Sequence, residues 1–161
     1  LDAPGRGLMV APLDVAWMRN VYQVRGALDS LAARLAAARQ WRLDPRLIEI
    51  GRKCARGRNI KAMIDADMAF HNAIYAASNN PLIELSAQVH WDHLRRVMGE
   101  VLQSSRQRSA VWDEHEAIAL AIFKGDADHA AALIHQHSET ASDHLADRLS
   151  RFLRSNAGEA S

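Results

Sequence analysis

An acid and an imidazole, Asp67 and His71, stand four residues apart in a segment that we expect to be helical. Residues with this spacing lie one above the other on the same helix face. Ile64, Ile74 and Ser78 continue that face at the spacing of a stripe directed at a protein core. A carboxylate and an imidazole buried there without partners would each cost about 1–3 kcal/mol or more, so both need partners.

Two kinds of partner would satisfy this pair. One is protein: the carboxylate and the imidazole would hydrogen-bond to each other, as buried polar groups usually do. The other is a metal ion, for which the pair would supply half of a four-ligand set. The pair alone favours the hydrogen bond, but other parts of the chain change the balance.

Two more histidines fall on apolar stripes in later segments. His115 shares its face with Val111, Ile118 and Ile122, whereas His137 shares its face with Ala130, Ile134 and Ala141. One such histidine is more often a satisfied core residue than a ligand. A single cation would nevertheless satisfy one carboxylate and three imidazoles at once. This ligand set suits zinc, which we place first, and also nickel, manganese or iron. The remaining histidines are interpreted as surface or peripheral residues: His90, His93, His129, His135 and His144.

Helices must position these residues. Few glycines (8) and prolines (4), with abundant alanine and leucine, indicate an all-α fold. Caps and breaks divide the chain into helices at about 14–39, 45–57, 60–77, 81–104, 109–124 and 127–153. Their short connections predict an antiparallel bundle of six helices around a buried metal and ligand site, or of seven if residues 1–14 hide a short extra helix.

Apolar rows on the first and fourth of these helices add to the pattern. The first helix has a stripe that we expect to face the core: Val21, Val24, Leu28, Leu31 and Leu35. On the fourth helix one line carries Leu82, Leu85, Val89 and Arg96.

Length and composition bound the class of protein. The chain has 161 residues, 48% of them hydrophobic, which suits one domain with a real core. A formal charge of +1 does not indicate a strongly basic nucleic-acid surface. The single cysteine, Cys54, excludes an internal disulfide and fits a reducing compartment, so we expect a cytoplasmic protein. No apolar run approaches the ~18 residues of a membrane span. Because the chain begins Leu-Asp-Ala-Pro, we expect it to be part of a longer protein.

Several short sequence motifs, in the same order and with the same spacing, resemble those of the FadR-type C-terminal (FCD) domain of bacterial GntR-family transcription regulators. The resemblance covers about residues 15–145 and rests on these motifs: Val24-Arg25-Gly-Ala-Leu28-Asp29, Asp67-Met-Ala-Phe-His71, Ala77-Ser-Asn-Asn80-Pro-Leu82, Glu114-His115-Glu-Ala-Ile118 and Ala121-Ile-Phe-Lys-Gly-Asp126. An alanine-rich run then leads to His137. Residues 5–12 are similar to the last wing strand of the winged-helix DNA reader in that family. Asp29 departs from the family, where glutamate is usual.

The resemblance implies a domain organisation. Residues 1–13 would be a remnant of the wing strand and linker of a missing N-terminal winged-helix domain, 14–154 the effector-binding domain, and 155–161 a disordered tail. Six helices point to the smaller, VanR-like branch of the family.

The resemblance also implies a function for particular residues. The metal-binding subgroup of the family would place its ligands at Asp67, His71, His115 and His137. A small carboxylate effector, such as an organic or sugar acid, would fill open metal positions, and candidates for holding it are Arg25, Asn80 and Arg96. The chain would act as a homodimer and control operator DNA through the missing domain.

Two alternatives belong to other classes of protein. A metal with open positions can activate water, so a metal-dependent hydrolase or oxygenase built on a helical bundle is one of them. It lacks an obvious base, because Glu114 neighbours His115 but should point away from the ion. The other is a helical dimerisation module whose histidines pair with one another, which predicts neither a metal nor a pocket.

Overall fold

The computed structural model describes residues 13–101 and 108–159, and all regular structure in these ranges is helical. The expected all-α fold is thereby confirmed. The helices of the described ranges are α1 (Val15–Ala38), α2 (Pro45–Arg56), α3 (Ile60–Ala77), α4 (Pro81–Val101), α5 (Arg108–Lys124) and α6 (Ala127–Glu159).

Side chains of the sequence itself set the helix ends. Asp14 and Asp44 each accept a hydrogen bond from the backbone N–H two residues further on, and so cap α1 and α2. Asn80 does the same for α4. Gly125 ends α5 with a φ of 77°, a conformation that suits glycine, and Asp126 then caps α6. The cap and break signals therefore located most of the helix boundaries.

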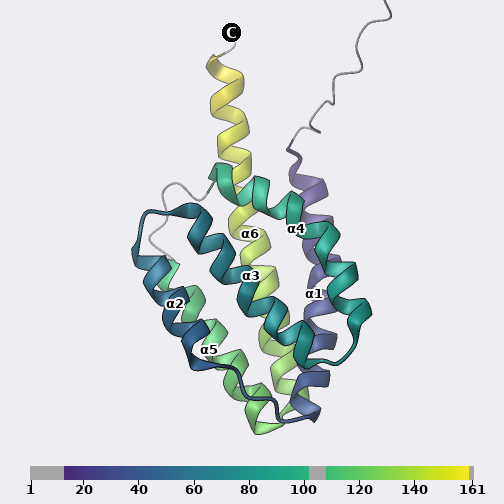
Figure 1. The fold of residues 1–161 in the computed structure, drawn as a ribbon. Coiled ribbons are helices and arrows are strands. Elements are labelled where there is room, and N and C mark those ends of the chain that lie inside the picture. The colour runs from purple at the N-terminus through teal and green to yellow at the C-terminus, as the bar shows by residue number, and fades with distance from the viewer. Residues whose placement is uncertain (1–12, 102–107, 160–161) are drawn as a thin grey trace, which may run out of the picture.

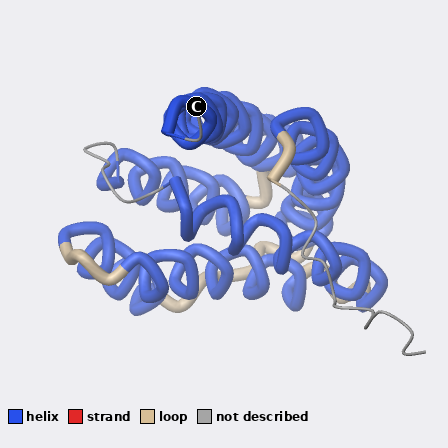
Figure 2. Tube along the Cα trace, turned by 90° about the horizontal axis from the view of Figure 1, so that it is seen from above, coloured by secondary structure: helices blue, strands red, loops and turns tan. Residues whose placement is uncertain are grey.

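α3 packs against α1, α2 and α4. In Figure 1, α2 and α5 lie on one side of α3 and α1 and α4 on the other, while α6 runs behind it. α6 packs most extensively against α1 and also contacts α4 and α5. The described loops, drawn in tan in Figure 2, are short. α3, α5 and α6 can therefore direct side chains that are distant in sequence towards one centre.

The face of α1 that packs into the bundle differs from the expected one. Val24 and Leu31, two members of the expected core-facing stripe, are exposed. The buried face of the C-terminal half is instead made of small side chains: Ala32, Ala33, Ala36 and Ala37. Because the distance between packed helices depends on the side chains at the contact, these alanines let α1 lie close to its neighbours. The prediction is confirmed for Val21, which is buried, and for Leu28 and Leu35, which pack against the core, but it was wrong for Val24 and Leu31 because it weighted the larger apolar residues.

The apolar line on α4 is also exposed. Leu82, Leu85 and Val89 turn away from the bundle, and Val89 is 70% exposed. The opposite face of α4, with Ile83, Trp91 and other residues, is the one that packs inward. Exposed contiguous apolar side chains of this kind usually mark a contact with another molecule.

The core has two apolar clusters with polar residues between them. The first includes Ile118 of α5 and Ile134 of α6, and the second includes Met18 of α1 and Leu149 of α6. The polar residues that lie between or beside them, here called the polar layer, are Arg25, Asp29, Asp67, His71, His115 and His137. On α1 and on α6 the polar layer falls between the segments that build the two clusters.

The ends of the chain differ from the expectations or lie outside the description. α6 continues to Glu159, about six residues further than expected, so residues 155–159 of the predicted disordered tail are helical. The predicted wing strand at 5–12 and the possible extra helix in 1–14 fall almost wholly outside the described residues. No helix in the described ranges is both long and apolar enough to cross a membrane.

The packing of α2 against α5 yields a testable prediction. A Cβ added at Gly51 would lie 2.1 Å from the ring of Trp112. Gly51→Ala should therefore lower the free energy of unfolding by about 1–3 kcal/mol, the usual cost of overpacking a core. Chemical denaturation measures this change.

Gly99→Ala is the matched control, because a Cβ at Gly99 in α4 meets no atom of the described residues within 4 Å outside the backbone of its own helix. Alanine is a better helix former than glycine, so this variant should be neutral or more stable by about 0.5–1 kcal/mol. Equal stability of the two variants would contradict the close contact between Gly51 and Trp112.

Candidate metal centre

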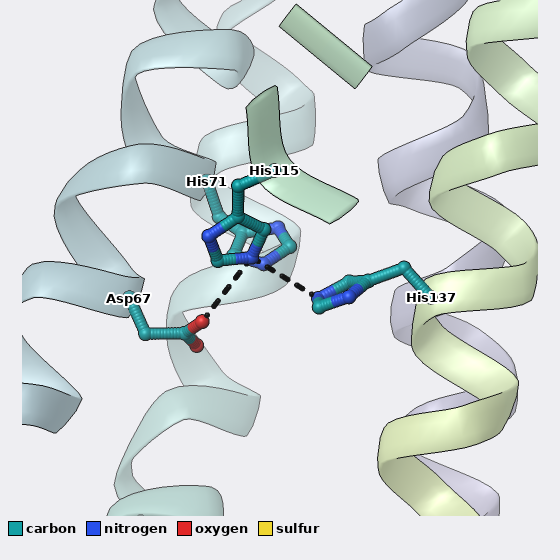
Figure 3. Close-up of side chains that lie close together, drawn as sticks. All are labelled: Asp67, His71, His115 and His137. Carbon is teal, nitrogen blue, oxygen red and sulfur yellow. Dashed lines mark hydrogen bonds and ion pairs between the residues drawn. The ribbon is translucent and has the colours of Figure 1, made fainter. Parts of the chain in front are cut away.

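Three helices bring four potential metal ligands together. Asp67 and His71 come from α3, His115 from α5 and His137 from α6, and one ligand atom of each lies within 4.8 Å of all the others. Figure 3 shows the carboxylate and the imidazoles directed at a common region. His71 and His115 are fully buried, and His137 is nearly so. The structure thus brings together the four residues that the sequence singled out.

The distances between the donor atoms fit a bound metal ion. His115 Nε2 lies 3.3 Å from His137 Nε2 and 3.5 Å from Asp67 Oδ1. Donors at about 2.0–2.2 Å from a tetrahedral zinc ion are about 3.3–3.6 Å apart, so both separations match edges of such a site. All the separations are within 4.8 Å, so any pair near this limit would require a small closure of the side chains around the ion.

The hydrogen-bonding state of His71 supports the same interpretation. Neither ring nitrogen of His71 makes a hydrogen bond with a described residue, although the side chain is fully buried. A buried polar group without a partner costs about 1–3 kcal/mol. A cation at the centre would remove this cost for the nitrogen that faces the other ligands.

Carboxylates lie against the outer sides of two of the imidazoles. His137 Nδ1 is 2.7 Å from Glu114 Oε2, and His71 Nδ1 is 3.5 Å from Asp29 Oδ2. A carboxylate at one ring nitrogen favours a proton there and leaves the lone pair of the other nitrogen free for a metal. Glu114, the residue that the enzyme alternative considered as a base, is therefore a partner of His137.

Arg25 and Asp29 form the charged core of the polar layer. Arg25 Nε lies 3.5 Å from Asp29 Oδ2, and the guanidinium carbon lies 3.9 Å from the centre of the Trp91 ring. The hydroxyls of Tyr75 and Ser138 donate to Asp29. Burial alone would raise the pKa of Asp29, but the charge of Arg25 and the hydrogen bond from Tyr75 outweigh burial and hold that pKa below its usual value. Asp29 is thus a fixed anion on the outer side of His71.

The imidazoles of His71 and His115 are poor bases in this environment. Burial is the main cause that lowers the pKa of His71, and the nearby Arg25 charge lowers it further. Burial also lowers the pKa of His115 well below its usual value, with added effects of His137 and His71. Both rings are therefore unprotonated at neutral pH, which is the state that binds metals.

A cavity adjoins this cluster. Its volume is about 140 Å³, and Asp67, His137 and Arg25 line it. Tyr22 and Arg148 line it as well. The volume is well above the ~10–15 Å³ that one water needs, and it is below the ~300–1,000 Å³ of pockets for drug-sized ligands. The cavity therefore suits a small molecule that reaches two of the four potential metal ligands.

The three candidate effector ligands differ in position. Arg25 is buried and lines the cavity. Asn80 accepts a hydrogen bond from the backbone N–H of Leu82 as a helix cap, and it is not among the residues that line the cavity. Arg96 is exposed on α4 and does not line the cavity either. The structure thus brings only Arg25 of these three to the site.

Other residues at the site were missed by the sequence interpretation. Arg148 and Tyr22 were not considered, and His144, which also lines the cavity, was placed on the periphery. Glu114 was considered without its contact to His137. The stripe His137, Ala141, His144 and Arg148 on one helix face was the only sequence signal for the last two residues of that row.

The structure defines a class of domain: a helical bundle in which one carboxylate and three imidazoles form a buried cluster beside a small cavity. A family model described as the FCD domain matches residues 20–140. The chain belongs to the FCD domain family, which forms the C-terminal domain of GntR-family regulators. No curated protein sequence matches the chain.

The lowered pKa values predict how the stability of chelator-treated protein depends on pH. His71 and His115 gain protons near their ordinary pKa of 6.5 in the unfolded chain, but only at lower pH in the folded protein. The free energy of unfolding should therefore decrease as the pH falls below 6.5, by at most about 1.4 kcal/mol per pH unit for each proton. Carboxylates such as Asp29 change the free energy of unfolding only when the pH approaches their ordinary pKa of 3.8, where they gain protons in the unfolded chain.

Urea denaturation between these pH values measures the effect. His115→Gln removes one of the two imidazoles and should make the dependence shallower. His129→Gln replaces an exposed imidazole and should leave it unchanged. The same pH dependence in all three proteins would show that the buried imidazoles are not its source.

Proposed function

We propose that this chain is the effector-sensing and dimerisation domain of a bacterial GntR-type transcription regulator and belongs to the metal-binding, VanR-like branch. A divalent metal bound by Asp67, His71, His115 and His137 and a small carboxylate beside it would together set the affinity of a separate winged-helix domain for operator DNA. The observation that carries this proposal is the buried convergence of these four residues beside the cavity.

The chemistry of the donor set supports a resident metal. Neutral imidazoles and a carboxylate suit zinc, which remains the first candidate, and also nickel, manganese or iron. Asp29 and Glu114 hold the outer nitrogens of His71 and His137. When bound, the metal would supply a cation with open coordination positions for an anionic effector.

The cavity supports a carboxylate as that effector. Arg25 presents a buried guanidinium there, and a guanidinium makes bidentate hydrogen bonds to carboxylates. The Tyr22 hydroxyl is buried and has no described hydrogen-bond partner. Burial raises the pKa of Tyr22, so this hydroxyl keeps its proton and can donate to an anion. Asn80 and Arg96 would not take part directly from their observed positions.

α1 provides a route from the effector to the DNA reader. Tyr22 and Arg25 both belong to α1, which begins at Val15, directly after the residues assigned to the linker. Two conformations of the domain could differ in the position of α1. An effector that binds one of these conformations more tightly than the other increases the population of that conformation. In a dimer, such a shift would change the spacing of two DNA readers.

The exposed apolar rows support a homodimer. Leu82, Leu85 and Val89 of α4 are exposed, as are Trp17 and Val24 of α1, a helix that contacts α4. A two-fold interface uses the same patch on both copies, so one row of this kind is sufficient to build it. We therefore place the dimer contact on the outer faces of α4 and α1.

The metal proposal predicts a chelator-sensitive melting temperature. Elemental analysis of purified protein should find a stoichiometric divalent metal, and a chelator should lower the melting temperature. A His71→Ala/His115→Ala variant should hold no metal and should not respond to the chelator. Glu114→Gln should weaken metal binding by about 10–100-fold, because it removes the charge that orients His137.

His129→Ala, which changes an exposed imidazole, is the control and should behave like the wild type. The proposal would be wrong if the wild-type protein contained no stoichiometric metal and if the wild type and the double variant responded equally to the chelator.

The dimer proposal predicts a change of mass in solution. Leu85→Glu and Val89→Glu each place a charge in the apolar row of α4, and both should shift the protein from dimer to monomer in sedimentation velocity. Leu120→Glu on α5 changes a residue of comparable exposure on another helix, and this variant should remain dimeric. Dissociation by Leu120→Glu alone would place the interface on α5.

A further inference from the structure

The cavity follows one face of α6 away from the four-ligand cluster. The α6 residues that line it are His137, Ser138, Ala141, His144, Leu145 and Arg148. At 1.5 Å per residue, the Cα atoms of His137 and Arg148 are about 16 Å apart along the helix. Arg148 therefore lines the cavity about three helical turns away from His137. The cavity is therefore elongated, with a different group at each end.

Both ends of the cavity favour anions. At the inner end lie the potential metal ligands Asp67 and His137 together with Arg25 and the unpartnered Tyr22 hydroxyl. At the outer end lies Arg148. A ligand that spans the cavity would meet a cationic group at each end once a metal is bound.

Arg148 has donor capacity to spare. Its one hydrogen bond to the described residues runs from Nη1 to the backbone oxygen of Val101, at 3.4 Å. No carboxylate of those residues lies within ion-pair distance of it, whereas neighbouring Arg151 is paired with Asp147 at 2.6 Å. A guanidinium has five N–H donors and is suited to a carboxylate. Contact with the last carbonyl of α4 thus uses only part of this capacity.

The walls between the two ends are mostly apolar, with Ser138 and His144 of α6 as the polar exceptions. Met63 and Ile64 of α3, Met98 of α4, Trp112 of α5 and Leu145 of α6 contribute the apolar surface. A sugar acid would bury several hydroxyls against these side chains, and each hydroxyl without a partner costs free energy. A hydrocarbon segment would instead be stabilised there by removal of its surface from water.

We propose that the effector is a dicarboxylic acid with an apolar body. One carboxylate binds at the metal, with Arg25 and the Tyr22 hydroxyl beside it, and the second carboxylate binds Arg148. This inference rests on the proposed function, since it assigns the ligand class of the same cavity. Arg148 is then the residue that distinguishes diacids from monoacids.

Isothermal titration calorimetry on the metal-loaded protein tests the inference. The probes are straight-chain α,ω-dicarboxylic acids of four to eight carbons and, for each, the monoamide that replaces one carboxylate by an uncharged group of similar size. The wild type should bind the best diacid about tenfold or more tightly than its monoamide, as loss of a charged hydrogen-bonded partner predicts. Arg148→Met should abolish this preference and leave the affinity for the monoamide unchanged.

Two further variants separate recognition from structure. Arg148→Lys keeps a positive charge and should restore part of the preference. Arg151→Met removes a neighbouring arginine on the same helix and should leave the preference as in the wild type. Comparing two ligands within each variant cancels any general loss of stability from the contact with Val101.

The outcomes distinguish the two proposals. Equal binding of diacid and monoamide by the wild type, an unchanged preference in Arg148→Met, or tighter binding of a sugar acid of equal length would overturn the dicarboxylate inference alone. If no acid binds the metal-loaded protein, or if binding is the same after chelation, the proposed function fails as well.

Discussion

The need to satisfy a layer of polar groups buried across the bundle determines how this domain is built. An unpartnered buried polar group costs about 1–3 kcal/mol, and a whole domain is stable by only about 5–15 kcal/mol. Several unpaired ring nitrogens would therefore consume a large part of the stability. The domain places Asp29 and Glu114 on the outer nitrogens of His71 and His137. The inner nitrogens are left to converge beside Asp67, where only a ligand from outside the chain can meet all of them.

The same layer connects the metal ligands to the rest of the molecule. Asp29 contacts both His71 and Arg25, and Arg25 lines the cavity from α1. A change of charge at the centre would thus act on a helix that packs more extensively against α6 than against any other helix. The FCD family fits this arrangement, because a regulatory domain must convert a small binding event into a displacement of whole helices.

Sequence periodicity located the site because polar residues interrupt apolar stripes. His71, His115 and His137 occupy positions where a core residue is expected, and this pattern is visible without coordinates. It failed on α1, where packing against α6 requires small side chains and turns Val24 and Leu31 outward. It also selected Arg96, which does not line the cavity, and did not consider Arg148, which does, since only the tertiary arrangement shows which arginine faces the cavity. The capping role of Asn80 depends only on its immediate neighbours in the sequence and could be predicted from them. Its predicted role in effector binding required its position relative to the cavity, which the sequence does not give.

The division of the core into two apolar clusters has a consequence for cooperativity. α2 and α5 contribute to one cluster, while the N-terminal half of α1 and the C-terminal half of α6 build the other. A cation held by α3, α5 and α6 between them would act as a clamp on both halves. Without it, the layer between the two clusters would contain polar groups that lack a common partner, and the halves would open more independently, as separate foldons do in native-state hydrogen exchange. Metal occupancy would then decide whether this domain responds to force and heat as one body or as two.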